Sequence, residues 1–533
     1  MAKYIFVCGG VISGGGKGVT AASMAFLLKC RGHKVNLVKF DPYLSINAGL
    51  LAPREHGEVF LSDDGGELDL DAGHYERIGG VNITKDHICT AGTLYKELIE
   101  EQEEGKYLGQ TVQVVPHITD KIQKRLIKFG KEFDIVITEI GGTIGDAESY
   151  AFYEAIRQFK SKHDCITVIV APILWLETIQ EYKTKPLQNA VRSLNQQGLQ
   201  ADVILCRTST KELPDSIIDK VGSLTGVSTD NIFSAPDVET IYQVPIELYN
   251  QNFDDTIADL LNLKRSACRI QKFRDNVNKY VNNDLPFVNI GVFGKYSSNA
   301  VEAYLSLKEA LIHAGLANDC KVDIRWITAE DLEGNVSVAD KFKDLNGIIV
   351  PGGFDGRGVE GKIKAIKYAR ENNIPFLGIC LGLQCAVIEY ARNVCKLNGA
   401  NSTEFDKVTP HPVVNFIEGQ EKMTKKSSTM RLGAYDCELI KNSLAFSLYN
   451  KKIISERHRH RYEVNNEFVE VLRDKGLVIS GINPTTNLVE MIELENHPFF
   501  IATQAHPEFK SKLLEAAPLF KGLVAAAKKV QNG

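Results

Sequence analysis

Residues 4–20 read YIFVCGGVISGGGKGVT, and this stretch decides the fold that we predict for the first half of the chain. An apolar run over residues 4–8 predicts a buried strand, and residues 19–29 have the periodicity of a helix. A glycine-dense loop at residues 9–18 lies between them and holds a single lysine, Lys17. A strand, a glycine loop, a lysine and a helix in this order are typical of a phosphate-binding loop.

This glycine loop has two interpretations. Glycines let backbone N–H groups point towards an anion, and the N-terminus of the following helix adds partial positive charge, which favours phosphate binding. The alternative is a glycine-rich turn that binds nothing, and Lys17 argues against it. The strict pattern G-x-x-x-x-G-K-[ST] is not matched, since Val11 takes the first glycine position and Gly18 follows the lysine. We therefore expect a variant nucleotide-binding loop.

Further strand-like runs alternate with helical periodicity through the first half of the chain. This α/β alternation predicts a doubly wound parallel sheet with helices on both faces. Ligands of such sheets bind at the C-terminal ends of the strands, so polar residues at those ends are candidates for a site. The strands are predicted at 35–40, 134–140, 166–171 and 202–206, and the helices at 118–128 and 147–160.

Carboxylates follow two of the predicted strands. Residues 63–71 form an acidic run, of a kind that is usually a solvated loop; if the run is extended, Asp69 and Asp71 point the same way. Glu139 stands near the end of the strand at 134–140. Magnesium in nucleotide sites takes one or two carboxylates together with phosphate oxygens. Asp71 and Glu139 are therefore predicted magnesium ligands, with ordinary surface or capping carboxylates as the alternative.

Two lysines stand two residues apart at Lys183 and Lys185. Two close cations suit a second phosphorylated ligand. Lysines in a loop are more often simply solvated, so these residues predict a site only together with other signals.

The composition excludes several classes of protein. A net charge of −5 argues against a broad nucleic-acid-binding surface, and no apolar run reaches the length of a membrane span. The 11 cysteines are scattered without a CxxC pair, which is typical of reduced thiols rather than of disulfides or a zinc site. No signal peptide precedes the first strand. We expect a cytoplasmic protein with no nucleic-acid and no membrane partner.

A chain of 533 residues is too long for one hydrophobic core, so we expect more than one domain. The pattern changes after Leu263, where a polar and basic stretch begins that has no strand signals and allows a helix. A new alternation starts at Pro286, with a strand at 287–293, a helix at 300–314 and a strand at 321–327. We predict two doubly wound parallel-sheet domains at 1–263 and 286–533, joined by a linker at 264–285.

The second half carries the signature of a nucleophilic cysteine. A predicted strand at 375–379 ends at Cys380, which is flanked by glycines and followed by a helical pattern, as in a nucleophile elbow. His506 follows another predicted strand, and Glu508 stands two residues later, so that Glu508 can orient the imidazole that takes the thiol proton. The Gly352–Gly353 segment can supply oxyanion-hole N–H groups. A buried cysteine and a surface histidine are the alternatives for each residue alone.

The whole chain resembles the CTP synthase family, in which an N-terminal synthetase (amidoligase) domain is fused to a class I glutamine amidotransferase domain. The matching motifs occur in both halves and in the family's order. They are ISGGGKG (12–18), KFDPYL (39–44), EHGEVFLSDDGGELDLDAGHYER (55–77), YLGQTVQVVPHIT (107–119), EIGGTIGDAES (139–149), KTKPLQ (183–188), PGGF (351–354), GICLGLQ (378–384), NSTEF (401–405), RHRHRYEVN (457–465) and QAHPEF (504–509).

The resemblance implies a two-site reaction. ATP, a co-substrate used with Mg²⁺, phosphorylates the 4-oxygen of UTP, and ammonia then displaces phosphate to give CTP. The ammonia comes from L-glutamine through a glutamyl thioester on Cys380 and is channelled between the domains. The resemblance also implies activation by GTP, feedback inhibition by CTP, and self-association to a homotetramer, with filaments as a further assembly.

The resemblance also assigns residues to these roles. The catalytic residues are Cys380, His506, Glu508 and Lys17. ATP is held by Gly14, Gly15, Gly16, Lys17, Gly18, Val19, Asp71, Pro236, Asp237 and Val238, and the metal by Asp71 and Glu139. UTP and CTP are held by Ser13, Asp146, Ala147, Glu148, Lys183, Thr184, Lys185, Pro186, Leu187, Gln188 and Lys220. Glutamine is held by Gly353, Leu381, Gly382, Leu383, Gln384, Glu404 and Arg461. The lid that binds GTP includes Arg357 and Glu360.

The chain departs from the family's pattern at three places. Asp355 replaces a glycine and adds negative charge beside the expected GTP lid. Ala505 replaces a phenylalanine before the catalytic histidine, and residues 45–53 differ from the usual run. None of these changes removes a catalytic group.

Two other functions compete with this interpretation. A related amidotransferase that acts on a carboxylate has a similar architecture, but it lacks the full Cys–His–Glu pattern and the KTKPLQ stretch. A polymerising scaffold without chemistry is the other alternative, and the complete set of expected catalytic residues argues against it.

Overall fold

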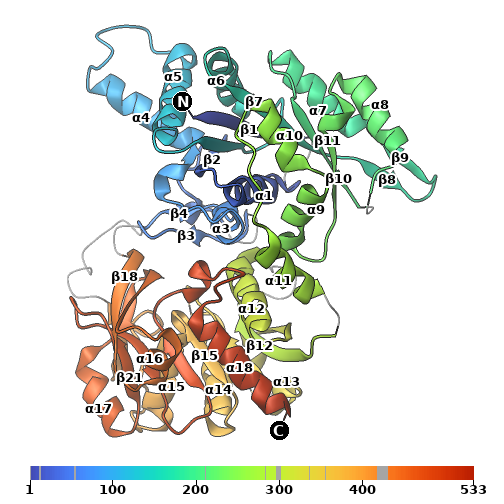
Figure 1. Ribbon diagram of the computed structural model, residues 1–533. Helices are drawn as coiled ribbons and strands as arrows, with labels where there is room; N and C mark the ends of the chain where they lie inside the picture. Colours follow the sequence, from blue (N-terminus) through green and yellow to red (C-terminus); the bar gives the residue numbers. More distant parts are fainter. Residues whose placement is uncertain are drawn as a thin grey trace. The chain divides into compact units, whose positions relative to one another are not determined.

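The computed structural model describes residues 2–10, 14–52, 56–209, 212–281, 284–295, 302–334, 337–354, 356–416 and 430–532. The chain divides into two compact units (Figure 1). The first consists of Met1–Leu51 with Asp71–Val281, and the second of Ala52–Leu70 with Asn282–Gly533. This division differs from the predicted one in two places, because residues 52–70 belong to the second unit and most of the expected linker belongs to the first.

The sheet of the first unit has seven strands, and every pairing in it is parallel. The five strands predicted for this half are present, and β5 and β11 extend the sheet at its two edges. In spatial order the strands are β11 (Ile232–Pro236), β10 (Val203–Thr208), β7 (Cys165–Pro172), β1 (Lys3–Gly9), β6 (Ile135–Ile140), β2 (Val35–Asp41) and β5 (Ile88–Thr90).

Helices cover both faces of this sheet, as Figure 1 shows for α5 and α6 on one face and α1 on the other. The central strand β1 is buried along almost its whole length, which explains its continuous apolar sequence. The helices are α1 (Lys17–Cys30), α3 (Asp71–Arg77), α4 (Ala91–Glu103), α5 (Thr119–Phe129), α6 (Tyr150–Lys160), α7 (Lys185–Gln196), α8 (Asp215–Thr225), α9 (Val244–Asn250), α10 (Phe253–Leu260) and α11 (Gln271–Val281).

The second unit has a nine-stranded sheet, which confirms the α/β class but corrects the prediction of a purely parallel sheet. Its first five strands are parallel and the rest are antiparallel. A parallel connection needs a crossover of about a dozen residues or more, whereas only residues 483–488 separate β21 from β22. In order the strands are β13 (Lys321–Thr328), β12 (Phe287–Gly294), β14 (Gly347–Val350), β15 (Phe376–Ile379), β23 (Phe500–Thr503), β22 (Val489–Glu493), β21 (Val478–Ile482), β18 (Arg431–Leu439) and β19 (Ile453–His460).

Two apolar cores lie on the two faces of this second sheet. One is built with α14 and α15, and the other with α12 and α18. The helix expected at 300–314 begins at Leu305 among the described residues. The helices are α12 (Leu305–Ala317), α13 (Val338–Phe342), α14 (Val359–Glu371), α15 (Leu381–Asn393), α16 (Leu444–Tyr449), α17 (Val469–Asp474) and α18 (Pro518–Asn532).

Three smaller sheets complete the fold. The hairpin of β3 (Phe60–Leu61) and β4 (Glu67–Leu68) belongs to the second unit, and that of β8 (Leu174–Leu176) and β9 (Glu181–Lys183) to the first. A three-stranded sheet joins β16 (Asn401–Ser402), β17 (Pro412–Phe416) and β20 (Tyr462–Val464). Among the described helices, none combines the length and the apolar character needed to cross a lipid bilayer.

Two candidate active sites

The glycine loop follows the C-terminal end of β1 and leads into α1, as predicted. Lys17 is the first residue of α1, and its ammonium group donates a hydrogen bond to the carbonyl of Gly142 at 3.0 Å. Gly9 leaves room for the end of the Lys17 side chain, since a Cβ there would lie 2.5 Å from Lys17 Nζ. Gly16 has a φ of 86°, which favours glycine. Ser13 and Val11 lie outside the described residues.

Gly18 departs from the strict loop pattern for a steric reason. A Cβ at this position would lie 1.9 Å from Asp71 Oδ1, so a larger residue would displace the carboxylate. Asp71 opens α3 and also forms an ion pair with Lys39 at 2.7 Å. Because β4 ends at Leu68 and α3 begins at Asp71, the acidic run is not extended up to Asp71, and the condition for Asp69 and Asp71 to point the same way is not met.

Glu139 is buried in β6 and accepts a hydrogen bond from the Tyr75 hydroxyl. Burial and the negative charge of Asp71 raise the pKa of Glu139 to about 8, against the opposing effect of Lys39 and Lys17. Two carboxylates that repel each other in this way suit a divalent cation. Within the described ranges no cluster of three or more potential metal ligands occurs. Magnesium in nucleotide sites takes one or two carboxylates and completes its ligand shell with phosphates and water, so two carboxylates are a sufficient contribution from the protein.

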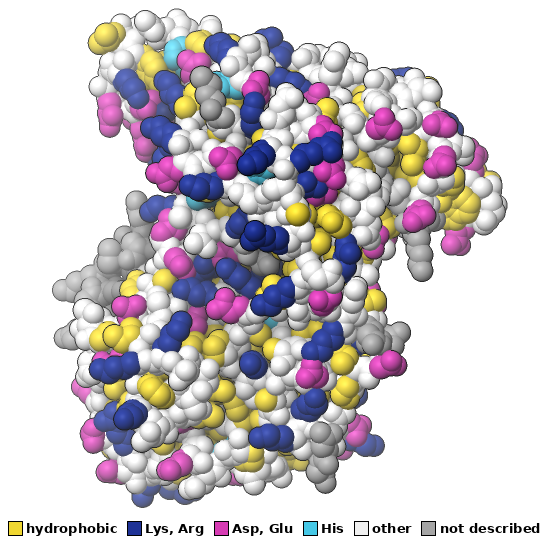
Figure 2. Space-filling view, viewed as in Figure 1, with side chains coloured by type: hydrophobic (Ala, Val, Ile, Leu, Met, Phe, Trp, Pro, Cys, Tyr) yellow, Lys and Arg dark blue, Asp and Glu magenta, His cyan; other side chains and the backbone are white. Residues whose placement is uncertain are grey.

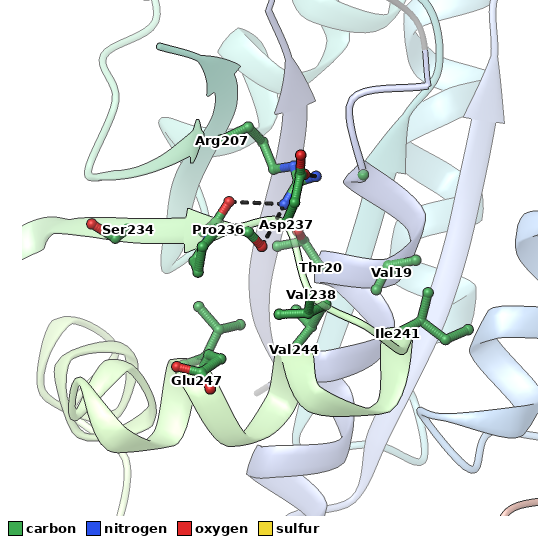
Figure 3. A pocket seen from close by; sticks show the side chains of 13 residues that line it. Val19, Thr20, Arg207, Ser234, Pro236, Asp237, Val238, Ile241, Val244 and Glu247 are labelled. Atoms are coloured by element: carbon green, nitrogen blue, oxygen red, sulfur yellow. Dashed lines mark hydrogen bonds and ion pairs between the residues drawn. The ribbon is translucent and has the colours of Figure 1, made fainter. Parts of the chain in front are cut away.

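A pocket of about 220 Å³ lies beside the loop (Figure 3). It is lined by Gly16 and Val19 from the loop and the start of α1, by the predicted residue Pro236 at the end of β11, and by the predicted residues Asp237 and Val238 that follow it. Apolar side chains from α9 and the preceding turn contribute to the wall, which suits a flat aromatic base. The structure thus brings together two groups of predicted residues that are far apart in the sequence.

Arg207 also lines this pocket, and sequence reasoning missed it. Its guanidinium donates to the carbonyls of Ala235 and Pro236 at 2.8 and 3.1 Å, and pairs with Asp237 at 2.6 Å (Figure 3). Arg207 could have been found from the sequence by its position near the C-terminal end of β10, because ligands bind at that edge of a parallel sheet.

Among the residues expected to hold UTP and CTP, Asp146, Ala147 and Glu148 come after β6, those at 184–188 follow the β8–β9 hairpin, and Lys220 lies on α8. Asp146 accepts hydrogen bonds from the backbone N–H and the hydroxyl of Thr143, at 3.1 and 2.5 Å. The Gln188 amide donates to the Thr184 hydroxyl at 2.8 Å. Ala147 and Glu148 form the turn that precedes α6, while Lys185, Pro186 and Leu187 begin α7.

Lys183 and Lys220 act on the same carboxylate. The Lys183 ammonium pairs with Glu181 at 2.7 Å, and the hydrogen bond and charge of Lys183, together with the charge of Lys220 on α8, hold the pKa of Glu181 below its usual range. The structure therefore brings these two predicted lysines near one another.

Cys380 occupies a sharp turn between β15 and α15. Its φ of 53° and ψ of −102° form a strained conformation that is typical of a nucleophile elbow. Glycines permit the close packing around it, since a Cβ on Gly382 would lie 2.1 Å from the Val350 carbonyl oxygen. The cysteine is therefore placed by the geometry that the sequence pattern predicts.

His506 and Glu508 complete the expected constellation. His506 Nδ1 lies 2.7 Å from Glu508 Oε1. A Cβ on Gly352 would lie 2.7 Å from His506 Cε1 and 3.5 Å from Cys380 Cβ, so this glycine leaves the space in which the two side chains meet. Burial alone would lower the pKa of His506, but the charges of Glu508 and Cys380 outweigh it and raise the pKa to about 10. The raised pKa favours a protonated imidazole beside the sulfur of Cys380, and a neighbouring base of this kind is a usual partner of a cysteine nucleophile.

The predicted glutamine-binding residues surround this elbow. Gly353 and Leu381 lie close together, since a Cβ on Gly353 would be 3.5 Å from the Leu381 side chain. The buried Gln384 amide donates to the Tyr462 carbonyl at 2.8 Å. Burial and the charge of Glu404 raise the pKa of Tyr462, while Arg461 opposes them. Gly382 and Leu383 belong to the first turn of α15.

The predicted GTP-lid residues have partners within the second unit. The Glu360 carboxylate on α14 pairs with Arg392 of α15 at 2.9 Å, and Arg357 Nε lies 3.9 Å from Glu330. Asp355 lies outside the described residues.

These two sites, one built around a phosphate-binding loop and the other around a Cys–His–Glu constellation, define a class of glutamine-dependent ligases. Residues 3–263 match the family model described as CTP synthase N-terminus, and residues 299–526 match that of class-I glutamine amidotransferase. The chain belongs to the CTP synthase family. As a member, it is an enzyme that forms a carbon–nitrogen bond with glutamine as the nitrogen donor.

Relatives cover the chain almost completely. A CTP synthase of Methanocaldococcus jannaschii is 50% identical over 535 residues, with 98% of each chain covered. A CTP synthase of Caldanaerobacter subterraneus subsp. tengcongensis is 49% identical over 531 residues, covering 99% of this chain and 98% of that one. A solved glutaminase domain of Trypanosoma brucei CTPS with bound acivicin is 40% identical, covers 45% of this chain and 94% of its own, and has a TM-score of 0.43.

Proposed function

We propose that this enzyme converts UTP to CTP with ATP and glutamine, by the two-site reaction of its family. The observation that carries the proposal is the pocket beside Lys17, where the glycine loop and residues 236–238 converge at the C-terminal edge of a parallel sheet. ATP would place its base in this pocket and its phosphates on the loop. Asp71 and Glu139 would hold Mg²⁺, which when bound offsets charge on the transferred phosphoryl group.

The first unit activates UTP for substitution. The 4-oxygen of UTP attacks the γ-phosphorus of ATP, and ADP leaves. Phosphorylation is needed because an unmodified 4-oxo group is a poor leaving group. Lys17 stabilises the charge of the phosphoryl group during transfer. Ammonia then attacks C4, and inorganic phosphate departs to leave CTP. The predicted residues around 146–148, 183–188 and Lys220, with Ser13, bind UTP and also CTP as feedback inhibitor.

The second unit supplies the ammonia. His506 takes the proton of Cys380, and the thiolate attacks the side-chain carboxamide carbon of glutamine. Backbone N–H groups near Gly352 and Gly353 stabilise the oxyanion, and the proton on His506 passes to the departing ammonia. Water then attacks the thioester to release glutamate. Since free ammonia is mostly protonated at neutral pH, we propose that it reaches the activated UTP along an enclosed path.

Regulation, assembly and location belong to the same proposal. GTP would activate glutamine hydrolysis at a lid that includes Arg357 and Glu360. Self-association is supported by the β8–β9 hairpin, where Leu174, Leu176 and Ile179 are exposed and hydrophobic side chains gather (Figure 2). All eleven cysteines are free thiols, which supports a reducing compartment such as the cytoplasm.

One comparison tests the proposal. CTP formation is measured from UTP, ATP and Mg²⁺, with either glutamine or ammonium chloride, in the wild type and in Cys380→Ala. We expect Cys380→Ala to lose glutamine-dependent synthesis and to keep ammonia-dependent synthesis. Loss of both in a folded variant would contradict two separate sites. No CTP from the wild type with either nitrogen source would leave the carboxylate amidase or the scaffold as the better explanation.

A further inference from the structure

The acidic run at residues 63–71 contains a second functional element besides Asp71. The β3–β4 hairpin belongs to the second unit, although its sequence lies within the first half of the chain. Its apolar residues Phe60 and Leu61 have no exposed surface, and Leu68 is 5% exposed. The hairpin is therefore packed into this unit and is not a solvated loop.

The hairpin is anchored before it begins. Both carboxylate oxygens of Glu58 accept a hydrogen bond from the backbone N–H of Ser306 at 3.1 Å, near the start of α12. The Ser306 hydroxyl also donates to this carboxylate, and the Glu58 N–H donates to the carbonyl of Glu302 at 2.9 Å. A carboxylate at a helix N-terminus is a favourable contact, so the entry to the hairpin is held in place.

The turn of the hairpin holds the strand that supports the catalytic histidine. Asp63 pairs with Arg457 of β19 at 2.6 Å and with Lys510 at 3.3 Å. The carbonyl of this same Arg457 accepts a hydrogen bond from the backbone N–H of His506 at 2.7 Å. The Asp63 carbonyl in turn accepts from Ala434 at 2.8 Å, which ties the hairpin to β18.

The second strand of the hairpin, β4, is linked to Cys380 through another arginine of β19. Glu67 is buried and pairs with Arg459 of β19 at 2.8 Å. The carbonyl of Arg459 faces the Cys380 sulfur at 3.9 Å. Asp63 and Glu67 therefore each pair with a β19 arginine, Arg457 or Arg459. The main-chain carbonyl of Arg457 contacts His506, and that of Arg459 contacts Cys380.

Phe60 adds an apolar contact on the histidine side. Its ring packs edge-on against Phe509, with centroids 5.3 Å apart, and Phe509 packs against His506 at 5.5 Å. The Arg457 guanidinium also lies 5.3 Å from the Phe60 ring centroid. Main-chain hydrogen bonds, ion pairs and ring contacts from one hairpin therefore converge on the Cys380–His506 pair.

We propose that the β3–β4 hairpin is a positioning element for glutamine hydrolysis, in which Asp63 and Glu67 align β19 and thereby hold Cys380 and His506 in reactive geometry. This inference rests on the proposed glutaminase function of the second unit. The acidic residues touch no reacting atom, so their effect should fall on the catalytic step rather than on glutamine binding.

The test uses the full-length enzyme and the variants Asp63→Asn and Glu67→Gln. Glu438→Gln is the matched control, because Glu438 pairs with Lys452 at 2.9 Å beside the start of β19, in an exposed ion pair. Glutamate release gives kcat and KM for glutamine, and ammonia-dependent CTP synthesis reports on the first unit. The rate of Cys380 alkylation by iodoacetamide, read by mass spectrometry, reports on the thiolate without turnover.

We expect kcat for glutamate release to fall between about tenfold and a hundredfold in Glu67→Gln, since small misplacements of reacting groups have effects of this size. The KM for glutamine and ammonia-dependent synthesis should stay within about twofold of the wild type, because binding and the other site are untouched. Cys380 alkylation should slow in parallel. Asp63→Asn should lower the same two rates, but by a smaller factor than Glu67→Gln. Asp63→Glu keeps the charge, so its kcat for glutamate release and its rate of Cys380 alkylation should remain close to those of the wild type.

The outcomes separate the inference from the proposed function. A wild-type enzyme that releases no glutamate would overturn the proposed function itself. If the wild type is active, and Asp63→Asn and Glu67→Gln release glutamate and undergo Cys380 alkylation at the same rates as Glu438→Gln, the inference is overturned. A fall in both activities, together with a lower melting temperature than that of Glu438→Gln, would show that the hairpin only stabilises the fold and would overturn it as well.

Discussion

At the scale of single residues, the two sites depend on glycines whose missing Cβ atoms leave room for functional groups. Gly18 makes room for Asp71, Gly9 for Lys17, and Gly352 for His506. These contacts explain why the first loop departs from the common phosphate-loop pattern after its lysine. The same contacts allow substitutions that act on one site at a time.

Gly18→Ala should inactivate the first site. The added methyl group meets the Asp71 carboxylate at 1.9 Å and must displace it. We expect CTP synthesis with either nitrogen source to fall by about a hundredfold, the effect typical of a misplaced group in an active site. Glutamate release from glutamine, assayed on the same preparation, should stay near the wild-type rate. Equal loss of both activities would indicate misfolding rather than a displaced ligand.

The pKa of His506 gives a prediction about stability. Because its folded-state pKa is raised from 6.5 to about 10, its contribution is fully present below pH 6.5 and is lost as the pH rises through 10. Glu508→Gln removes one cause of the shift. At pH 6 the free energy of unfolding of the wild type should be higher than that of Glu508→Gln by roughly 2–5 kcal/mol. This difference should become smaller as the pH rises towards 10. Urea titrations across this range measure it, and a gap that widens with pH would contradict the assignment.

At the scale of elements, the segment expected to be a linker proves to be structured. The helix α11 buries Phe273, whose ring packs on Phe26 with centroids 4.3 Å apart. The sequence allowed a helix in this stretch, but it did not show that the helix packs against the first unit, because the helix is largely polar. The division between the two units therefore follows α11 rather than preceding it.

Phe273→Ala tests this packing. Truncation of a buried phenylalanine typically costs about 3–5 kcal/mol. We expect a loss of this size in the free energy of unfolding of the first unit, whereas the exposed control Asn278→Ala should change it by less than about 0.5 kcal/mol. Denaturant unfolding followed by circular dichroism measures both. Equal stability of the two variants would restore the view of 264–285 as a loose linker.

At the scale of the whole molecule, the apolar β8–β9 hairpin is the surface on which assembly is best tested. Leu174 is 46% exposed and Ile179 is 53% exposed, side by side with further apolar residues of the hairpin. The double variant Leu174→Ser, Ile179→Ser removes apolar area that a second copy would cover. The association constant measured by sedimentation velocity should fall by about tenfold or more, since every 1.4 kcal/mol lost at an interface is tenfold in affinity. At equal protein concentration the variant should therefore contain more of the smaller species. An unchanged distribution would exclude this hairpin as a contact.

Much of the candidate chemistry was predictable from local sequence. The glycine loop with Lys17 and the cysteine elbow follow predicted strands, and Glu139 stands near the end of another. Arg207 stands just past the predicted strand at 202–206, so the same rule could have found it. The Asp63–Arg457 pair was not predictable in this way, because it depends on a contact between segments that lie far apart in the chain, and no local pattern records such a contact.

The sequence alone determined the α/β class and the family, because these follow from hydrophobic periodicity and from motifs of a few residues. Its assignment of reactive groups to particular residues stays a prediction. Only the tertiary structure decided that the second sheet ends in antiparallel strands, that α11 is packed, and that residues 52–70 belong with the second unit. It also showed why Gly18 stands where a serine or threonine is usual. These four features have a common reason. Each depends on which parts of the chain, far away in sequence, pack against a segment, and this is decided only in three dimensions.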